Sequence, residues 1–356
     1  MSSSNATQVT STRPAQRDAG TARRVRLSDI ARDLGVSTAT ISKVVNDRTD
    51  VAEDTRRRVK DALAAAGYRK PNAGQTTDSA PLIDVIFERL DNVWGLEVMI
   101  GVEQEVRERR LGVVITESGD RGGSPAAWLD AVIARNPLGA IIVTSDLSEA
   151  DTERLAAHGI PIVLLDPSGD PNPSAASIRA DNWSGGLTAT RHLITLGHRK
   201  IGIITGPMDM MCSRARLDGY RAAIEEANIP FDPSLCIEGE FKMASGLECA
   251  KQLLDRPDQP TAIFACNDLM AMGVYEAARV LRLRIPEDLS VVGFDDVQTA
   301  ALMGPPLTTV HQPIREMSVE AVRMLLAMRE GRHRPGGTII PTSFIVRGST
   351  AAPGAE

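Results

Sequence analysis

Short apolar runs alternate with amphipathic stretches along the chain from residue 82 onward. Stretches with a 3.6-residue period, such as Glu97–Arg109 and Ser213–Ala227, predict helices. The apolar runs between such stretches predict strands, and they are Leu82–Phe87, Gly112–Thr116, Ala140–Val143, Ile160–Asp166, Ile201–Gly206, Ala262–Asn267 and Leu289–Asp295. This alternation is typical of doubly wound parallel sheets with helices on both faces. There are too many units for one compact sheet, so we expect an α/β body with two similar lobes that divide near Asp181.

Residues 27–45 follow a different pattern, that of two short helices joined by a tight turn. Ser28 is the expected N-cap of the first helix, and Gly35 follows this helix at a position where a left-handed backbone is needed. Ser37 is expected to cap the second helix, whose apolar stripe includes Ile41 and Val44. With a third helix predicted over residues 53–66, these elements predict an all-α helix-turn-helix head.

The second helix of a helix-turn-helix lies in the major groove of DNA, with its N-terminal residues at the base edges. Thr38 and Ala39 are placed to contact a base edge or a thymine methyl group, and Lys43 to donate to guanine. Asn46 and Arg56 are expected to contact phosphate, which positions the head without reading sequence. The complete set of predicted DNA-contacting residues is Ser37, Thr38, Ala39, Thr40, Ser42, Lys43, Asn46 and Arg56.

The charge of the chain is unevenly distributed. Residues 21–72 contain twelve Lys and Arg against seven Asp and Glu, so the net charge of −6 leaves the remainder strongly acidic. A basic head on an acidic body indicates that the head binds a polyanion such as DNA. No apolar run approaches the ~18 residues that span a bilayer. Residues 1–25 are rich in Ser, Thr and Arg, which predicts a disordered tail rather than a secretory signal. We therefore expect a cytoplasmic protein that binds no membrane.

The sequence carries none of the common motifs of a cofactor-dependent or hydrolytic enzyme. No Gly-x-Gly-x-x-Gly or Walker motif opens a predicted helix, and there is no Gly-x-Ser-x-Gly elbow. The four cysteines form no Cys-x-x-Cys pair and have no histidine at metal spacing, so we expect small buried hydrophobic residues at Cys212, Cys236, Cys249 and Cys266. We predict neither an enzyme nor a bound cofactor or metal. A transport-type binding protein would account for the body but not for the head.

Polar side chains stand where the predicted strands of the body end. Ligands of open parallel sheets bind beyond the carboxyl ends of the strands, here in the crevice between the lobes. A carboxylate, an amide and a guanidinium that converge there suit a polyol, because each bridges adjacent hydroxyl groups. Aromatic rings stack on the apolar face of a sugar. The residues expected to line the crevice are Asp91, Asn92, Arg216, Asn267 and Asp295, with Trp94 and Phe241 as the stacking rings.

Other roles are open for several of these residues. Asn267 and Asp295 are also placed to cap the helices that follow them, and Trp94 to pack in the core under the first helix of the body. Trp183 either lines the crevice or packs beneath it. His198 closes a predicted helix at the negative end of its dipole, which favours a structural role.

The head resembles that of the lactose-repressor (LacI) family in the order and spacing of its residues. The motifs that carry the resemblance are Leu27–Asn46, Val51, Thr55-Arg56 and Gly67-Tyr68. The resemblance implies that Thr38 and Ala39 select the operator and that Lys43 reads a further base. Ala52 departs from the family, which often has a capping Ser or Thr at this position, worth about 1 kcal/mol.

The linker that follows the head matches the family less well. In the family this stretch forms a short helix whose leucine wedges into the minor groove and bends the operator. Here residues 71–81 contain Gly74 and Pro81 and offer no leucine before Leu82. A plain flexible tether and a minor-groove hinge helix are both open for this segment.

The body resembles the sugar-sensing domain of the same family, which shares its fold with periplasmic binding proteins. The matching motifs are Asp181-Asn182-x-x-Gly185-Gly186, Leu196–Ile201, Arg214-x-Arg216-x-x-Gly219-Tyr220, Asn267-Asp268-x-Met270-Ala271-x-Gly273, Val291–Asp296 and Pro306–Val310. The resemblance implies effector positions at Arg216, Phe241, Asn267, Asp295 and Gln312. It favours a small carbohydrate as the effector, with a purine or another non-sugar effector as the alternative.

The resemblance also implies how the chain is divided and assembled. We expect a tail over residues 1–25, a DNA-binding head over 26–70, a linker over 71–81 and a body over 82–350. The two lobes should comprise 82–180 with 313–341, and 182–311 with 342–350. A homodimer that represses transcription, and whose operator affinity the effector controls, is the expected assembly. Such a dimer predicts a double-stranded, pseudo-palindromic operator with half-sites about one helical turn apart.

Overall fold

The computed structural model describes residues 31–32, 34–45, 51–65, 80–119, 126–143, 148–169, 172, 175–332 and 336–354. The chain forms two compact units, within Met1–Ser79 and Ala80–Glu356. The predicted tail over residues 1–25, the expected cap Ser28 and the linker residues 71–79 lie outside the described residues. No helix in the described ranges is both long enough and apolar enough to cross a membrane.

The first unit is a small helical head. Its described helices are α2 (Thr38–Val45) and α3 (Glu53–Ala65). Ile41, Val44 and Val59 are fully buried and form its core together with Ala31, because the apolar faces of the helices meet there. Ser37 caps α2 as predicted, since its hydroxyl accepts a hydrogen bond from the backbone N–H of Thr40 at 3.0 Å. Gly35 has a φ of +66°, the left-handed conformation that the tight turn requires.

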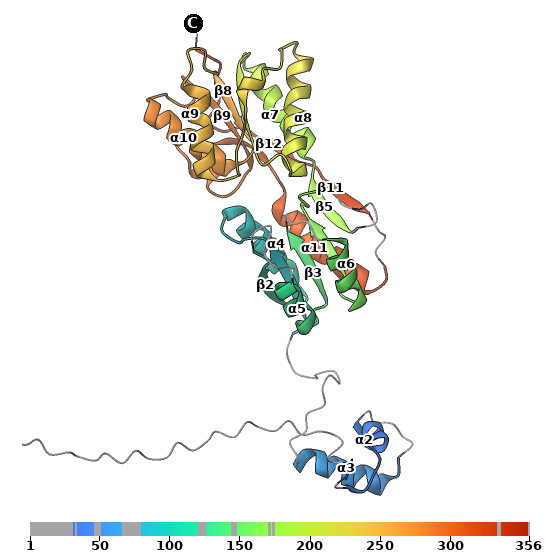
Figure 1. Ribbon diagram of the computed structural model, residues 1–356. Coiled ribbons are helices and arrows are strands. Elements are labelled where there is room, and N and C mark those ends of the chain that lie inside the picture. The colour runs from blue at the N-terminus through green and yellow to red at the C-terminus, as the bar shows by residue number, and fades with distance from the viewer. Residues whose placement is uncertain are drawn as a thin grey trace, which may run out of the picture. The chain divides into compact units, whose positions relative to one another are not determined.

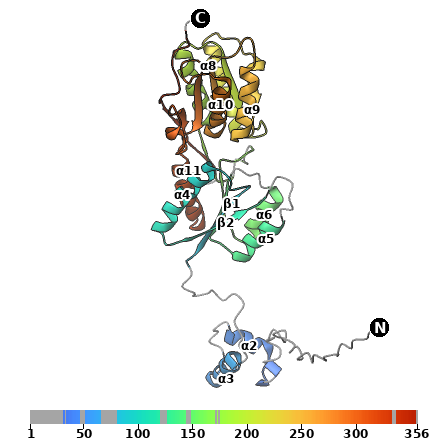
Figure 2. The same cartoon turned by 90° about the vertical axis from the view of Figure 1, so that its left-hand side faces the viewer.

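The second unit is the body, and its first lobe is built on a six-stranded parallel sheet with the order β11-β5-β4-β3-β1-β2. The strands are β1 (Leu82–Phe87), β2 (Gly112–Glu117), β3 (Gly139–Val143), β4 (Ile162–Leu165), β5 (Ser177–Ala180) and β11 (Gly337–Ile340). The helices of this lobe are α4 (Val93–Glu108), α5 (Ala126–Arg135), α6 (Glu149–Ala157) and α11 (Ile314–Arg329). Helices α4 and α11 lie side by side on one face of the sheet, and α5 and α6 cover the other (Figure 2).

The second lobe repeats this plan with the strand order β12-β10-β9-β8-β6-β7, in which β12 alone of the described strands is antiparallel to its neighbour. The strands are β6 (Ile201–Thr205), β7 (Cys236–Glu238), β8 (Ala262–Ala265), β9 (Ser290–Asp295), β10 (Thr308–His311) and β12 (Ser343–Ile345). The helices are α7 (Asn182–Thr195), α8 (Met211–Glu226), α9 (Met243–Leu254) and α10 (Asp268–Leu281), with 3₁₀ turns at Pro233–Leu235 and Ala300–Leu302. The pair α7 and α8 and the pair α9 and α10 lie on opposite faces of the sheet (Figure 1).

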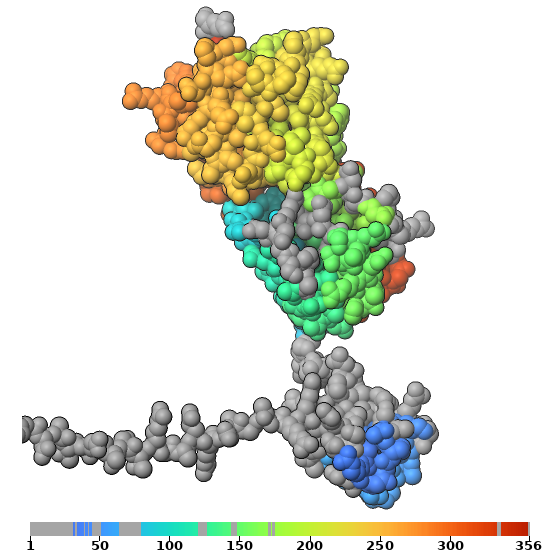
Figure 3. All heavy atoms as spheres, in the orientation of Figure 1, coloured from blue at the N-terminus to red at the C-terminus, as the bar shows by residue number. Residues whose placement is uncertain are grey.

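The chain passes between the lobes at three places in the described range: between β5 and α7, between β10 and α11, and between β11 and β12. In the space-filling view the lobes are distinct masses, coloured cyan to green for the first and yellow to orange for the second (Figure 3). Gln312 stands at the second passage, where its N–H donates to the Asp295 carbonyl oxygen of the second lobe and its own carbonyl accepts from Ile314 at the start of α11. At this passage, Gln312 therefore links the end of β9 in the second lobe to the start of α11 in the first lobe.

Two glycines bring α7 and α8 into close contact. A β-carbon at Gly186 of α7 would lie 2.3 Å from the carbonyl oxygen of Arg216, and one at Gly219 of α8 would lie 2.2 Å from that of Trp183. No real side chain fits at such distances, so both positions require glycine. The close crossing fixes the backbone of Arg216 beside the start of α7, at the passage between the lobes.

A buried ion pair joins β1 to α5 in the first lobe. Asp84 points from β1 and is 0% exposed. Its carboxylate accepts hydrogen bonds from Nε and Nη2 of Arg135 at 2.9 and 2.8 Å and from the hydroxyl of Thr116 at 2.7 Å. Burial of this carboxylate is tolerated because each of its oxygens is hydrogen-bonded.

The architecture confirms the predicted two-lobed, parallel-sheet body with helices on both faces of each sheet. The predicted apolar runs do not include strands β5, β7, β10, β11 and β12, because each of these short strands contains polar residues or glycine and so forms no continuous apolar run. Helix α4 begins at Val93, four residues before the predicted start, since Asn92 caps it by accepting a hydrogen bond from the N–H of Gly95. His198 is buried and its ring bonds Thr261, Ser290 and the carbonyl of Ala351; burial lowers its pKa, which fits a structural role.

Candidate functional site

A pocket with about 550 Å³ of empty space, including its open mouth, lies at the carboxyl ends of strands from both lobes. Asp166 follows β4 of the first lobe, and Asp295 ends β9 of the second. Parallel strands present their carboxyl ends at one edge of a sheet, so the two sheets deliver side chains to the same space. The lining residues are Asn92, Trp94, Asp166, Met210, Cys212, Arg216, Phe241, Asn267, Leu269 and Asp295.

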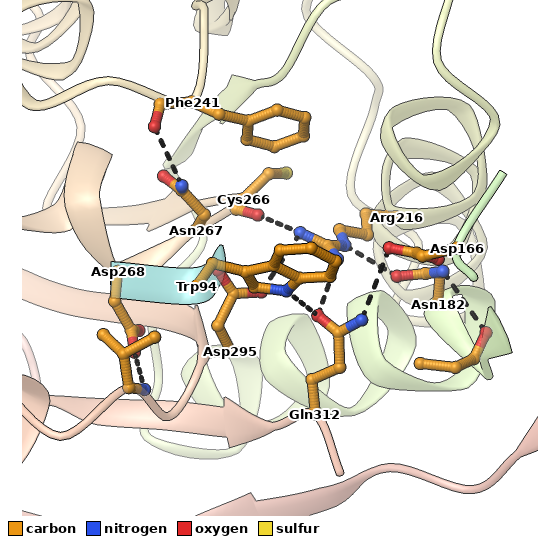
Figure 4. Close-up of polar contacts among 12 residues, drawn as sticks. Trp94, Asp166, Asn182, Arg216, Phe241, Cys266, Asn267, Asp268, Asp295 and Gln312 are labelled. Carbon is orange, nitrogen blue, oxygen red and sulfur yellow. Dashed lines mark hydrogen bonds and ion pairs between the residues drawn. The ribbon is translucent and has the colours of Figure 1, made fainter. Parts of the chain in front are cut away.

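Arg216 lies at the centre of the polar part of the pocket (Figure 4). It is only 3% exposed. Its guanidinium donates from Nε to Asn182 Oδ1 at 2.8 Å, from Nη1 to the carbonyl of Cys266, and from Nη2 to Gln312 Oε1 at 3.4 Å. The plane of Phe294 lies beneath the guanidinium carbon at 3.7 Å. The side chain is thus held in one orientation by acceptors around it and an aromatic ring under it.

Two buried carboxylates flank this guanidinium. Asp295 Oδ1 lies 3.7 Å from Arg216 Nη1, and Asp295 and Asp166 are each 5% exposed. Burial raises the pKa of both carboxyl groups, and the nearby charge of Arg216 opposes this rise. Both residues also have a left-handed backbone, with φ of +50° at Asp166 and +110° at Asp295. Non-glycine residues rarely adopt such angles, and they concentrate at functional sites.

Two asparagines combine capping with a place in the pocket wall. Asn92 caps α4, and Asn267 caps α10 by accepting a hydrogen bond from the N–H of Met270 at 2.8 Å. The side-chain amide of Asn267 also donates to the carbonyl of Phe241 at 3.1 Å. The sequence allows either capping or pocket lining for Asn267, and the structure has both. Asp295 is different, because a loop rather than a helix follows it.

The aromatic rings of Trp94, from the first lobe, and Phe241, from the second, both line the pocket (Figure 4). The indole N–H of Trp94 donates to Gln312 Oε1 at 3.4 Å, while part of the side chain packs on the core of the first lobe. Phe241 reaches into the pocket from the loop before α9, with a φ of +57°. Trp183 neither lines the pocket nor packs beneath it: it is 45% exposed, because it sits on the outer face of the first turn of α7.

Two of the residues predicted to line the pocket lie elsewhere. Asp91 is exposed and pairs with Arg89 at 2.9 Å, since the loop after β1 turns its side chain toward solvent. Gln312 is 1% exposed and lies behind the wall, where its amide contacts Arg216, Trp94 and Asp166. The other six predicted residues line the pocket together.

Four lining residues were not predicted. Asp166 could have been predicted from the sequence, because it is a polar residue at the end of an apolar run, as Asn267 and Asp295 are. Met210, Cys212 and Leu269 carry no such signal, because they are apolar residues near the starts of α8 and α10. Burial raises the pKa of Cys212 to about 11, so its thiol is neutral at pH 7. Among the described residues, no group of three or more His, Cys, Asp or Glu is placed to hold a metal ion.

The predicted DNA-contacting residues are concentrated on α2. Thr38 and Lys43 are exposed on this helix, Thr40 is half-buried, and Ser37 is its cap. Ala39 and Ser42 also lie on α2. Arg56 is half-buried on α3, and Asn46 lies outside the described residues. Helix α2 therefore exposes polar side chains, with one basic residue, Lys43, in its last turn.

Two family models match the chain: residues 26–72 match "Bacterial regulatory proteins, lacI family", and residues 190–350 match "Periplasmic binding protein-like domain". The HTH-type transcriptional repressor PurR of Haemophilus influenzae (strain PittEE) is 32% identical over 303 residues, covering 84% of this chain and 90% of its own.

Solved structures of regulators are also similar. The CelR–cellobiose complex has a TM-score of 0.70 and 30% identity, and it covers 92% of this chain and 100% of its own. The lac repressor dimer bound to operator and the anti-inducer ONPF has a TM-score of 0.69 and 28% identity, with coverages of 93% and 100%.

Proposed function

Because the chain belongs to the lacI family of bacterial regulatory proteins, we propose that it is a DNA-binding repressor whose operator affinity is controlled by a small carbohydrate bound between the lobes of its body. The observation that carries the proposal is the pocket in which Arg216, Asn267 and Asp295 converge and two aromatic rings, those of Trp94 and Phe241, share the lining. Carboxylate, amide and guanidinium groups bind adjacent hydroxyls by charge-assisted hydrogen bonds. The apolar face of a sugar ring stacks on Trp94 or Phe241.

Regulation follows from where the pocket lies. Its walls come from both lobes, so a ligand that contacts both stabilises one angle between them more than another. A ligand shifts such an equilibrium only by its difference in affinity for the two states, and the usual coupling between sites is about 1–3 kcal/mol. CelR, a similar regulator, was solved with cellobiose, which supports a sugar as the ligand class.

A purine is the second candidate effector. Trp94 and Phe241 both line the pocket, and an aromatic ring is also a stacking surface for a flat heterocycle. The carbohydrate is preferred because Asp166 and Asp295 supply carboxylate acceptors, which suit the several hydroxyl donors of a sugar.

A homodimer is part of the proposal. Leu96 and Ile100 are exposed one helical turn apart on α4, and Ile115 is exposed on β2 of the same lobe. Exposed apolar side chains that share a helix face are typical of protein interfaces. The lac repressor, a similar protein, was solved as a dimer on its operator. A two-fold dimer of this chain would read a pseudo-palindromic operator.

Replacement of Lys43 by alanine tests the DNA-reading role of α2. The operator is first obtained by selection from random double-stranded DNA with the full chain. We expect specific binding to weaken by about 1–3 kcal/mol, with a smaller loss on random DNA, because a base contact is lost. Arg56→Ala on α3 is the control, since Arg56 is expected to contact phosphate, which supports binding to both kinds of DNA equally. Equal losses for Lys43→Ala on both DNAs would make Lys43 a phosphate contact.

A thermal-shift screen of the full chain against mono- and disaccharides, nucleosides and purines tests the effector class. A ligand at about 100 times its dissociation constant stabilises the folded state by about 2.7 kcal/mol, which raises the melting temperature clearly. We expect a sugar to do so, and to retain its effect in Asp91→Asn, whose substitution lies outside the pocket. Stabilisation by purines alone would replace the carbohydrate by the second candidate.

A further inference from the structure

We propose that the pocket selects an uncharged effector rich in hydrogen-bond donors and excludes phosphorylated and carboxylated compounds, because two buried carboxylates, Asp166 and Asp295, face a single guanidinium. The inference rests on the proposed function for the identity of the pocket as the effector site, and it names the ligand class that this site accepts.

The charges that line the pocket set this preference. Among its described lining residues, Arg216 is the one cation, and Asp166 and Asp295 are the anions. With both carboxylates ionised the lining carries a charge of −1, and with one of the two carboxyl groups protonated it is neutral. Arg216 keeps one carboxylate ionised, because a buried guanidinium without a counter-ion is strongly unfavourable. In neither state does the lining offer the positive charge that a phosphate group requires.

The Arg216 guanidinium also uses most of its N–H groups in hydrogen bonds within the protein. Three of its five N–H groups go to Asn182, the Cys266 carbonyl and Gln312. Phe294 covers one face of the group. A phosphate that bound the guanidinium bidentately would displace these acceptors and leave them buried and unpaired. Arg179 lowers the pKa of Asp166 by its charge, but Arg179 does not line the pocket and its Nη1 contacts Met211 Sδ.

The carboxylate oxygens of Asp166 and Asp295, in contrast, can accept further hydrogen bonds. Oδ1 of Asp166 is buried, and no described residue donates a hydrogen bond to it. Oδ2 of Asp166 receives one long bond from Gln312 at 3.4 Å. Asp295 Oδ1 lies 3.7 Å from Arg216, beyond hydrogen-bond length. A ligand hydroxyl or amine that donates to these oxygens removes a buried, unpaired acceptor, whereas a phosphate oxygen at the same place adds another.

The remaining lining residues agree with an uncharged ligand. Met210, Leu269 and the neutral thiol of Cys212 supply apolar wall, and Trp94 and Phe241 supply rings. An anion placed against such a wall loses hydration without gaining a partner. A polyol or nucleoside, which combines hydroxyl donors with apolar faces, satisfies both parts of the pocket.

Inorganic phosphate is the probe that tests the charge argument without knowledge of the natural effector. The melting temperature of the full chain is measured in increasing potassium phosphate at pH 7.5, against potassium chloride of equal ionic strength. We expect no saturable shift for the wild type. In Asp166→Asn/Asp295→Asn, whose lining keeps only the positive charge of Arg216, we expect a saturable shift with a phosphate affinity at least tenfold above the upper limit set by the wild type.

Two controls make the result decisive. The added substitution Arg216→Leu should abolish the gain, because it removes the cation that would hold the phosphate. Asp166→Asn and Asp295→Asn alone provide smaller gains if the double variant does not fold. A saturable, Arg216-dependent phosphate shift in the wild type would overturn the inference, and so would the absence of any gain in all the folded variants.

Matched pairs of compounds separate this inference from the proposed function. Glucose and glucose 6-phosphate, and ribose and ribose 5-phosphate, are compared by the same measurement. Stabilisation of the wild type by a phosphorylated member overturns the charge selection and leaves a sugar-controlled repressor standing. If no neutral sugar binds but the phosphate results hold, the carbohydrate proposal fails and the exclusion of anions stands.

Discussion

Replacement of Arg216 by alanine is expected to lower the affinity for the effector by at least about 100-fold while leaving operator binding by the full chain intact. Arg216 is a buried cation that donates three hydrogen bonds and faces two buried carboxylates, and removal of such a buried charged partner costs about 2–5 kcal/mol in binding. Here the loss is compounded, because Asp295 and Asp166 would lose the charge that opposes the rise in their pKa. Titration of the sugar found in the screen, followed by thermal shift and by release from operator, measures both effects.

Arg216→Lys is the matched variant, since it keeps the charge but loses the planar fork that reaches Asn182, Cys266 and Gln312 at once. We expect it to retain the folded state and to lose most of the ligand affinity. Asp91→Ala serves as the control outside the pocket. An unchanged dose-response in Arg216→Ala would remove this residue from the effector site, and loss of operator binding in the same variant would show that it supports the fold of the body instead.

Replacement of Arg135 by methionine is expected to reduce the free energy of unfolding of the body by about 3–5 kcal/mol, the range found when one partner of a buried ion pair is removed. Asp84 would stay fully buried with only the hydroxyl of Thr116 as a donor among its present partners. Methionine keeps most of the side-chain volume, so the effect reports the charge rather than a cavity. Urea unfolding followed by tryptophan fluorescence measures the change.

Arg191→Met is the control for this measurement. Arg191 pairs with Glu226 at 2.7 Å between α7 and α8, but both side chains are about half-exposed. Exposed pairs contribute about 0–1 kcal/mol, so the control should unfold close to the wild type. Equal effects in the two variants would contradict the role of Asp84. The double variant Asp84→Asn/Arg135→Met should recover part of the loss, because it removes the unpaired buried charge.

Much of the site could be predicted from the sequence because of one geometric rule. In parallel sheets the carboxyl ends of the strands share an edge, so polar residues after apolar runs are brought together whatever the loops do. Asn267 and Asp295 were identified in this way, and Asp166 carried the same signal. The two-lobed fold and the helix-turn-helix followed from periodicity and capping, which depend on residues close in the chain.

The tertiary structure decided the features that depend on contacts between distant segments. The loop after β1 turns Asp91 to solvent, while Asn92, its neighbour, faces the pocket. Gln312 lies behind the pocket wall, because it stands where β10 passes to α11 and contacts both lobes. No local pattern specifies either placement.

The sequence by itself therefore determined the order of the elements, their burial pattern and the edge at which the site forms, since hydrophobic periodicity and strand direction are local properties of the chain. Only the folded body decides which groups accept hydrogen bonds from Arg216. It also decides which carboxylate oxygens are left without a hydrogen-bond donor. The reason is physical: hydrogen bonds need donor and acceptor atoms within about 3.5 Å. Asn182, Arg216, Cys266 and Gln312 are far apart in the chain and reach that range only in the folded body.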